Sequence, residues 1–123
     1  KLTMTDASAK GQWLGLQQAS GTAEANTAWQ LSADVFIPED PISCTLDIRA
    51  FTNKRSSPYP IYTTTILQYQ GATYGWIRLM ADIITPSRAG TYDMVIQISL
   101  VSTAPMGGQR NVVYIDDVVL RRK

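Results

Sequence analysis

The chain has 123 residues, of which 45% are hydrophobic and 17% are charged, and its formal net charge is +1. This length predicts one domain, residues 1–123, and the composition excludes a chain that is disordered throughout. The balance of 11 basic and 10 acidic residues provides no strong field for a polyanion, which argues against nucleic acid as a partner.

Several catalytic and metal chemistries are excluded by the residues that the chain lacks. It contains no histidine and one cysteine, Cys44, so no Ser-His-Asp or Cys-His arrangement and no cysteine-rich zinc site can form. We therefore predict that the protein is not an enzyme. No apolar run approaches the roughly 18 residues that span a bilayer, which predicts no membrane insertion. Because the chain begins at Lys1 rather than at Met, we interpret it as a domain cut out of a longer protein or as a mature form.

In chain order, nearly every segment shows apolar residues at alternate positions. The run 11–18 predicts an initial strand, and the small polar residues of 21–28 predict a loop or a short helical turn. Alternation then predicts strands at 29–37, 42–51, 62–70, 77–83, 93–100 and 112–120. Segments rich in proline or glycine separate these runs, and no helical period is present. The pattern predicts an all-β fold, an antiparallel β-sandwich or jelly roll.

Two adjacent carboxylates, Asp116 and Asp117, interrupt the last apolar run. Neighbouring side chains on a strand point to opposite faces, so we expect the two carboxylates to separate rather than act together. Two interpretations remain open. The pair belongs to a solvated strand end, or one carboxylate binds calcium, which prefers oxygen ligands.

Tyrosines and polar residues on the mixed faces are candidates for ligand binding. Tyrosine has a flat apolar ring with a polar end, which suits stacking on a sugar. Trp29 lies in phase with core residues, and Trp76 is expected at the edge of the core. Residues out of phase with the core runs usually form a solvated face, but on one concave sheet they would form a hydrogen-bonding trough. The candidates for ligand binding are Tyr62, Arg49, Arg78, Gln97, Asp47, Tyr59 and Tyr74.

Three segments carry a resemblance to a known family: Trp29-Gln-Leu-Ser-Ala-Asp-Val-Phe36, Tyr74-Gly-Trp-Ile-Arg-Leu-Met-Ala-Asp-Ile-Ile-Thr-Pro86 and Val113-Tyr-Ile-Asp-Asp-Val-Val-Leu120. In this order they resemble carbohydrate-binding modules with the galactose-binding-like jelly roll that accompany xylanases and glucanases. The resemblance implies a non-catalytic module that binds a polysaccharide or a cell-wall glycan on its concave sheet or at its loop tips. It also implies a structural calcium ion with Asp116 as a ligand.

An alternative function follows from the same resemblance. Similar domains occur in the tails and baseplates of bacteriophages, as receptor-binding or assembly units that can form trimers. The chain would then be a structural or receptor-binding domain of a phage tail or surface protein, with no sugar binding of its own. Both interpretations predict an extracellular or virion-associated protein.

Overall fold

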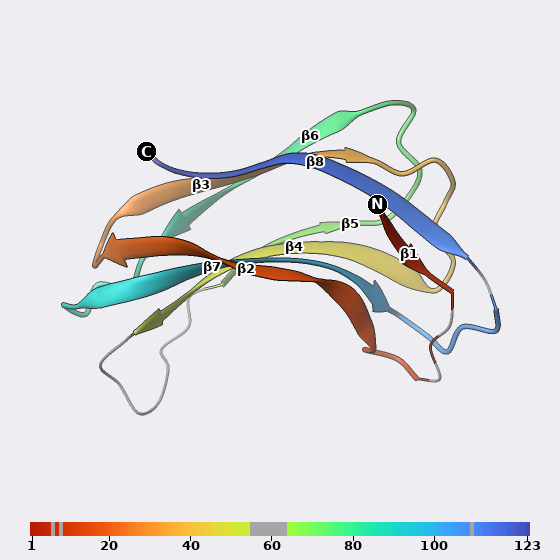
Figure 1. Cartoon of the computed structure of the whole chain (residues 1–123), viewed down its shortest axis with the longest axis horizontal. Helices are drawn as coiled ribbons and strands as arrows, with labels where there is room; N and C mark the ends of the chain where they lie inside the picture. The colour runs from red at the N-terminus through yellow and green to blue at the C-terminus, as the bar shows by residue number, and fades with distance from the viewer. Residues whose placement is uncertain (6, 8, 55–63, 109) are drawn as a thin grey trace.

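The computed structural model describes residues 1–123 except 6, 8, 55–63 and 109, and it shows a sandwich of two antiparallel β-sheets (Figure 1). In the described part of the chain, every regular element is a strand, so the predicted all-β fold is confirmed. No described helix is long and apolar enough to cross a membrane. The strands are β1 (Leu2–Met4), β2 (Trp13–Glu24), β3 (Ala28–Phe36), β4 (Cys44–Lys54), β5 (Thr64–Tyr69), β6 (Ile77–Ile84), β7 (Thr91–Ser102) and β8 (Asn111–Arg122).

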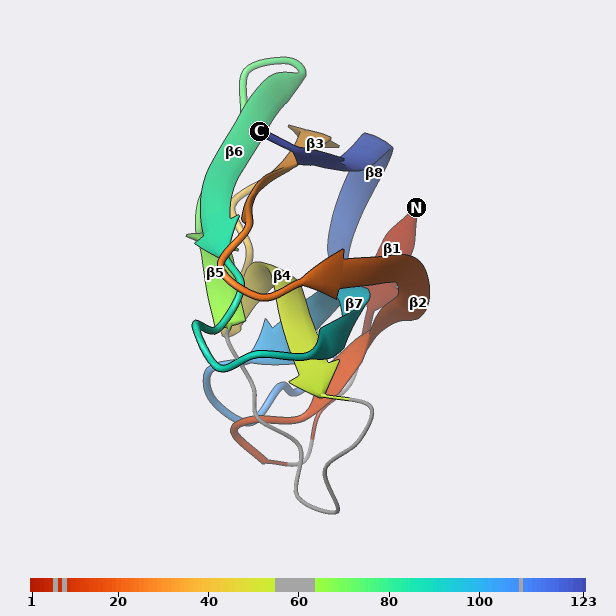
Figure 2. The ribbon, with the colours of Figure 1, turned by 90° about the vertical axis from the view of Figure 1, so that its left-hand side faces the viewer.

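The two sheets are built mainly from strands that are distant in the sequence. One sheet has the order β1-β8-β3-β6 and the other has the order β2-β7-β4-β5. We call them the upper sheet and the lower sheet, after their places in Figure 1. The view along the sandwich in Figure 2 shows the two layers, with β3, β6 and β8 in one and β2, β4 and β7 in the other. Such crossing connections are typical of jelly rolls.

The core lies between the sheets and is formed by the alternate residues that the sequence predicts. Leu31, Ala33 and Val35 of β3 are fully buried, and so are Leu46 and Ile48 of β4. Burial of each large aliphatic side chain contributes about 1.5–3 kcal/mol to folding, so this double row stabilises the sandwich. The buried thiol of Cys44 lies in the same cluster, and burial raises its pKa to about 11.

Strand β2 differs from its prediction. It continues to Glu24, where it still pairs with Thr91 of β7, and it passes through a bulge between Ala19 and Gly21. Gly21 has a φ of 117°, which glycine adopts without strain. The expected loop at 21–28 is therefore wrong over its first half. Strand β1 was not predicted, because a three-residue element carries too little pattern.

A second bulge lies in β8 and changes the orientation of the two aspartates. Asp34 pairs with Asp116 while Ser32 pairs with Val119, so β8 contains one residue more than β3 over this stretch. Asp117 lies in this bulge and has a φ of 44°, in the left-handed region. Asp116 and Asp117 are both exposed, and the expectation that they separate to opposite faces is wrong.

Candidate functional site

The outer face of the lower sheet gathers polar residues from all four of its strands. Because Leu46 and Ile48 point into the core, their neighbours Asp47 and Arg49 point outward. In Figure 1, β4 and β7 arch toward the upper sheet at their middles, so the outer face of the lower sheet is concave. We call this surface the concave face.

Strand register places the polar residues of the concave face in two adjacent rows. In the first row, Arg49 of β4 pairs with Gln97 of β7, which pairs with Gln17 of β2. In the second row, Asp47 pairs with Ser99 on one side and with Gln68 on the other. Neighbouring strands lie about 5 Å apart, so these side chains form one continuous polar surface.

An ion pair between Asp47 and Arg49 occupies the centre of this surface. Arg49 Nη2 donates to Asp47 Oδ2 at 2.8 Å, and the side chain of Asp47 is 2% exposed while that of Arg49 is 34% exposed. A carboxylate removed from water is costly unless it is paired, so Arg49 compensates for the burial of Asp47. The remaining exposed surface of the guanidinium leaves it accessible from the concave face.

Two buried polar atoms beside this ion pair have no hydrogen-bond partner among the described residues: Nε of Arg49 and Oγ of Ser99. An unsatisfied buried polar group costs about 1–3 kcal/mol. Both atoms are themselves buried, so a ligand on this face would contact the exposed part of the Arg49 side chain rather than either atom.

Gly15 allows β2 to approach β7 closely at this point. A Cβ atom on Gly15 would lie 2.0 Å from the carbonyl oxygen of Ile98 and 2.7 Å from Cα of Ser99. No side chain fits this space. Gly15 is flanked by Trp13 and Gln17, the nearest residues of β2 whose side chains point to the same outer face. The absence of a side chain at position 15 therefore lets β2 lie close to β7, which keeps Trp13 and Gln17 next to the polar rows.

Trp13 is the aromatic residue of the concave face among the side chains that the structure describes there. It pairs with Val101 of β7, is 56% exposed, and begins the edge strand β2. Trp13 was not among the residues predicted to bind a ligand. The signal was present, because Leu14 and Leu16 alternate with Trp13, Gly15 and Gln17 and so place Trp13 on the opposite face.

The structure brings together three of the residues predicted to bind a ligand: Asp47, Arg49 and Gln97. Tyr74 is fully exposed in the segment between β5 and β6, away from these three, and Arg78 lies on β6 of the upper sheet. Tyr59 and Tyr62 lie outside the described residues, so their roles remain predictions.

Arg78 belongs to an ion-pair network on the outer face of the upper sheet. Its Nε and Nη2 atoms donate to the two carboxylate oxygens of Asp34, each at 2.7 Å, and Nη2 also donates to Asp117. The hydrogen bond from Arg78 lowers the pKa of Asp34 below its ordinary value. This guanidinium donates from Nε and Nη2 to two carboxylates, whereas Arg49 donates from Nη2 to Asp47 and its Nε has no partner among the described residues.

A group of three aromatic side chains lies beside this network. The ring of Phe36 packs against Trp76 with 5.9 Å between centroids and stacks on Tyr114 at 5.8 Å. Trp76 is 56% exposed, so the expectation that it lies at the core edge is wrong. Val35 and Ile37 are buried, so Phe36 between them points to the outer face of the upper sheet. Trp76 packs against Phe36 and therefore lies on this outer face.

The Oδ1 atom of the predicted calcium ligand Asp116 accepts a hydrogen bond from the backbone N–H of Asp117 at 2.8 Å. Across the described ranges, no three Asp, Glu, Cys or His side chains are grouped so that they could hold a metal ion. Calcium takes 6–8 oxygen ligands, so the described residues do not supply a complete carboxylate set.

Comparison with known proteins places this geometry among β-sandwiches. No family model matches the chain, and no curated protein matches its sequence. The structure is similar to a family 16 carbohydrate-binding module, with a TM-score of 0.60 and 17% identity over 96% of this chain and 73% of that chain. It is also similar to the CBM22-1–GH10 modules of a Clostridium thermocellum endo-1,4-β-D-xylanase complexed with xylohexaose, with a TM-score of 0.52 and 12% identity over 97% of this chain and 29% of that one.

A viral protein shares the same architecture. The structure of infectious bursal disease virus, Gt strain, has a TM-score of 0.56 and 9% identity, covering 98% of this chain and 31% of that chain. The chain thus spans under a third of the xylanase and of the viral protein. At these identities the similarities establish a fold and no specific ligand. The predicted fold is confirmed: the chain is a β-sandwich of the jelly-roll kind that carbohydrate-binding modules adopt.

Proposed function

We propose that this protein is a non-catalytic carbohydrate-binding module that binds a polysaccharide or a cell-surface glycan on the concave face. The observation that carries the proposal is the row of polar side chains across β4, β7 and β2, in which Arg49, paired with Asp47, keeps 34% of its side chain exposed next to Gln97 and Gln17. The similarity in fold to carbohydrate-binding modules supports the same function. Such a module would work outside the cell.

The residues of the concave face suit a ligand that is rich in hydroxyl groups. The indole ring of Trp13 presents a flat apolar surface to the apolar face of a sugar ring. Gln17, Gln97 and Arg49 would exchange hydrogen bonds with hydroxyl groups, because they offer amide donors and acceptors and guanidinium donors. Trp13 and Gln17 are four residues apart on one strand, about 13 Å, so the face extends beyond a single sugar ring.

Replacing Trp13 with alanine should weaken binding to the preferred polysaccharide roughly tenfold, since an aromatic contact contributes about 0.5–1.5 kcal/mol beyond its buried area. The measurement is affinity electrophoresis on a panel of soluble xylans, mixed-linkage glucans and bacterial cell-wall glycans, followed by calorimetric titration. Trp76→Ala is the matched control, because Trp76 is exposed to the same extent on the opposite sheet. If Trp76→Ala abolishes binding to a polysaccharide that Trp13→Ala still binds, the proposed site is wrong.

A second candidate is an assembly or receptor-binding domain of a viral or surface protein with no sugar binding of its own. The similarity in fold to the virus structure supports it. So do the exposed apolar residues Met80 and Ile84 of β6 and Trp76 just before this strand. A blank glycan panel together with a stable trimer in light scattering would establish this candidate in place of the first.

A calcium ion at Asp116 is a further proposal, supported by the resemblance of the terminal strand to the family's calcium-binding motif. Calcium is expected to raise the melting temperature, and EDTA is expected to lower it again. Asp116→Asn should abolish the difference, whereas Asp82→Asn, another exposed carboxylate of the upper sheet, should keep it. Equal melting temperatures of the unmodified protein in calcium and in EDTA would exclude the ion.

A further inference from the structure

The outer face of the upper sheet presents exposed apolar side chains at regular positions along β6. Met80 is 56% exposed and Ile84 is 61% exposed, and Trp76, just before the strand, is 56% exposed. Successive members of this set are four residues apart, so they lie on one face of the strand at intervals of about 13 Å. Val119 of β8 is also exposed. A set of apolar side chains in water on one sheet face is typical of a protein–protein contact.

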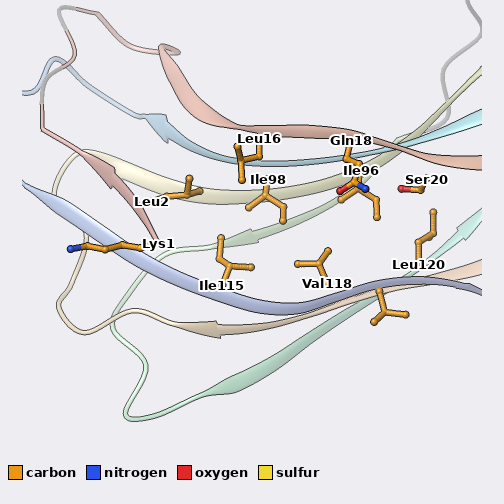
Figure 3. Close-up of a pocket in the computed structure, with 11 residues that line it drawn as sticks. Lys1, Leu2, Leu16, Gln18, Ser20, Ile96, Ile98, Ile115, Val118 and Leu120 are labelled. Carbon is orange, nitrogen blue, oxygen red and sulfur yellow. The ribbon is translucent and has the colours of Figure 1, made fainter.

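Strand β8 directs one set of side chains to the core and another set to this outer face. Figure 3 shows Ile115, Val118 and Leu120 pointing into the space between the two sheets. Because side chains alternate along a strand, and the bulge takes up one position, the residues between these three point to the opposite face. The outward set includes Asp116, Val119 and Arg121.

Strand register arranges the outer face in rows that run across β8, β3 and β6. The central row is Val119, Ser32 and Met80. On β8, the row on one side of it contains Asp116 and the row on the other side contains Arg121. Along β6, Trp76 and Ile84 lie at equal distances on the two sides of the central row. Positions that mirror each other across this row are therefore complementary in charge or both apolar.

We propose that this face binds a second copy of the chain, related to the first by a two-fold axis that runs along the central row. Rotation about this row places β6 over β6 and β8 over β8 and reverses the direction of each strand. Met80 and Val119 then meet the same residues of the second copy. Trp76 comes to lie over Ile84 of the second copy, and Asp116 comes to lie over Arg121. In such an isologous contact each of these pairs forms twice.

The charges that meet across the axis are the ones left without an ion-pair partner among the described residues. Asp117 bonds to Arg78, whereas Asp116 accepts a hydrogen bond from the backbone N–H of Asp117. Arg121 donates to the side-chain amide of Gln30, which is neutral. Asp116 and Arg121 can therefore pair between two copies without breaking an ion pair within either copy.

The twist and curvature of the sheet limit the contact to its middle. Twisted sheets pack face to face with their strands about 30° apart, and two residues from the axis this rotation shifts a side chain by less than the strand spacing of about 5 Å. In Figure 1, β3 and β8 arch away from the lower sheet, so the middle of the outer face protrudes. Two such faces touch chiefly along their central rows, and we expect a reversible dimer with a Kd in the micromolar range.

A glycan would match this face less well than a second copy does. The aromatic rings of Phe36, Trp76 and Tyr114 gather at one end of the face, and the exposed apolar side chains beyond them are not aromatic. Such side chains provide neither a flat ring for stacking nor hydrogen bonds to hydroxyl groups. The proposal is independent of glycan binding, because the concave face belongs to the other sheet and stays open in the dimer.

Sedimentation velocity of the 123-residue chain over a dilution series measures the dimer, with EDTA present so that calcium at Asp116 does not contribute. Met80→Lys brings two like charges together on the axis and should raise the Kd of the dimer by roughly tenfold or more. Leu14→Lys, at an exposed apolar residue of the lower sheet, should leave this Kd unchanged. The affinity of each site for polysaccharide should be equal in Met80→Lys and in the unmodified protein, so the two proposals are tested separately.

An exchange of charges tests the two-fold arrangement itself. Asp116→Arg alone and Arg121→Asp alone each place like charges opposite each other twice and should raise the Kd of the dimer by roughly tenfold. The double variant Asp116→Arg/Arg121→Asp restores opposite charges and should return the Kd to about that of the unmodified protein. The proposal is overturned by a protein that remains monomeric or forms a stable trimer, by a Met80→Lys protein that dimerises as before, or by a double variant that dimerises no better than the single ones.

Discussion

The Arg49→Met variant is expected to lose about 2–3 kcal/mol of folding free energy and also its retention by polysaccharide, whereas Asp47→Asn should lose less stability. The reason is the unequal exposure of the two partners. Removing one member of a buried ion pair costs roughly 3–5 kcal/mol, because the other charge stays buried without compensation. The side chain of Asp47 is almost completely buried, so after the loss of Arg49 its carboxylate cannot be hydrated.

The Asp47→Asn substitution removes the buried partner of the ion pair and leaves the more exposed one. With asparagine at position 47, the guanidinium of Arg49 keeps its partial exposure to water and can be hydrated. The exposure of Arg49 is also why the expected cost of losing it lies below the range for a fully buried pair. The double variant Asp47→Asn/Arg49→Met should be more stable than Arg49→Met alone, because no charge then remains in the buried position.

Urea denaturation of the four proteins measures these differences, and calorimetric titration with the preferred polysaccharide measures binding. Arg121→Met is the matched control, since Arg121 is exposed on the upper sheet and donates to the side chain of Gln30. We expect its stability to change by less than about 0.5 kcal/mol. If Asp47→Asn destabilises the protein as much as Arg49→Met does, burial of the carboxylate is not the controlling effect.

Gly15→Ala is expected to destabilise the protein by about 2 kcal/mol or more and to weaken polysaccharide binding with it. The added Cβ meets the backbone of Ile98 and Ser99 rather than a flexible side chain, so relief requires β2 to move away from β7. Such a movement displaces Trp13 and Gln17 from the polar rows that they adjoin. Replacing glycine by alanine otherwise reduces the entropy of the unfolded chain and would stabilise.

The control for this prediction is Gly107→Ala. A Cβ at Gly107 meets no atom within 4 Å, and its φ is outside the left-handed region. The Gly107→Ala protein should therefore be as stable as the unmodified protein or slightly more stable. Thermal unfolding measures the stability of the Gly15→Ala and Gly107→Ala proteins, and amide hydrogen exchange measures how well β2 is protected in each. A Gly15→Ala protein with unchanged stability and unchanged exchange along β2 would show that the two strands do not approach each other as closely as described.

Part of the candidate site could be predicted before any tertiary structure. Arg49 and Gln97 were selected because each falls out of phase with the aliphatic residues of its own strand, and the structure places them opposite each other on β4 and β7. Arg78 was selected by the same rule on its strand, and it lies on the other sheet. Alternation tells which face of a strand a residue occupies, but it does not tell which strands are neighbours.

What the amino-acid sequence determined by itself was therefore the fold class and the division of each strand into a core face and an outer face. That information is local, because side chains alternate along every strand whatever its partners are. The strand order, the burial of Asp47 and the place of Trp13 at the edge of the polar rows were decided by the tertiary structure. Each depends on pairing between segments far apart in the chain, and the bulge at Asp117 arises from a register that β3 imposes on β8.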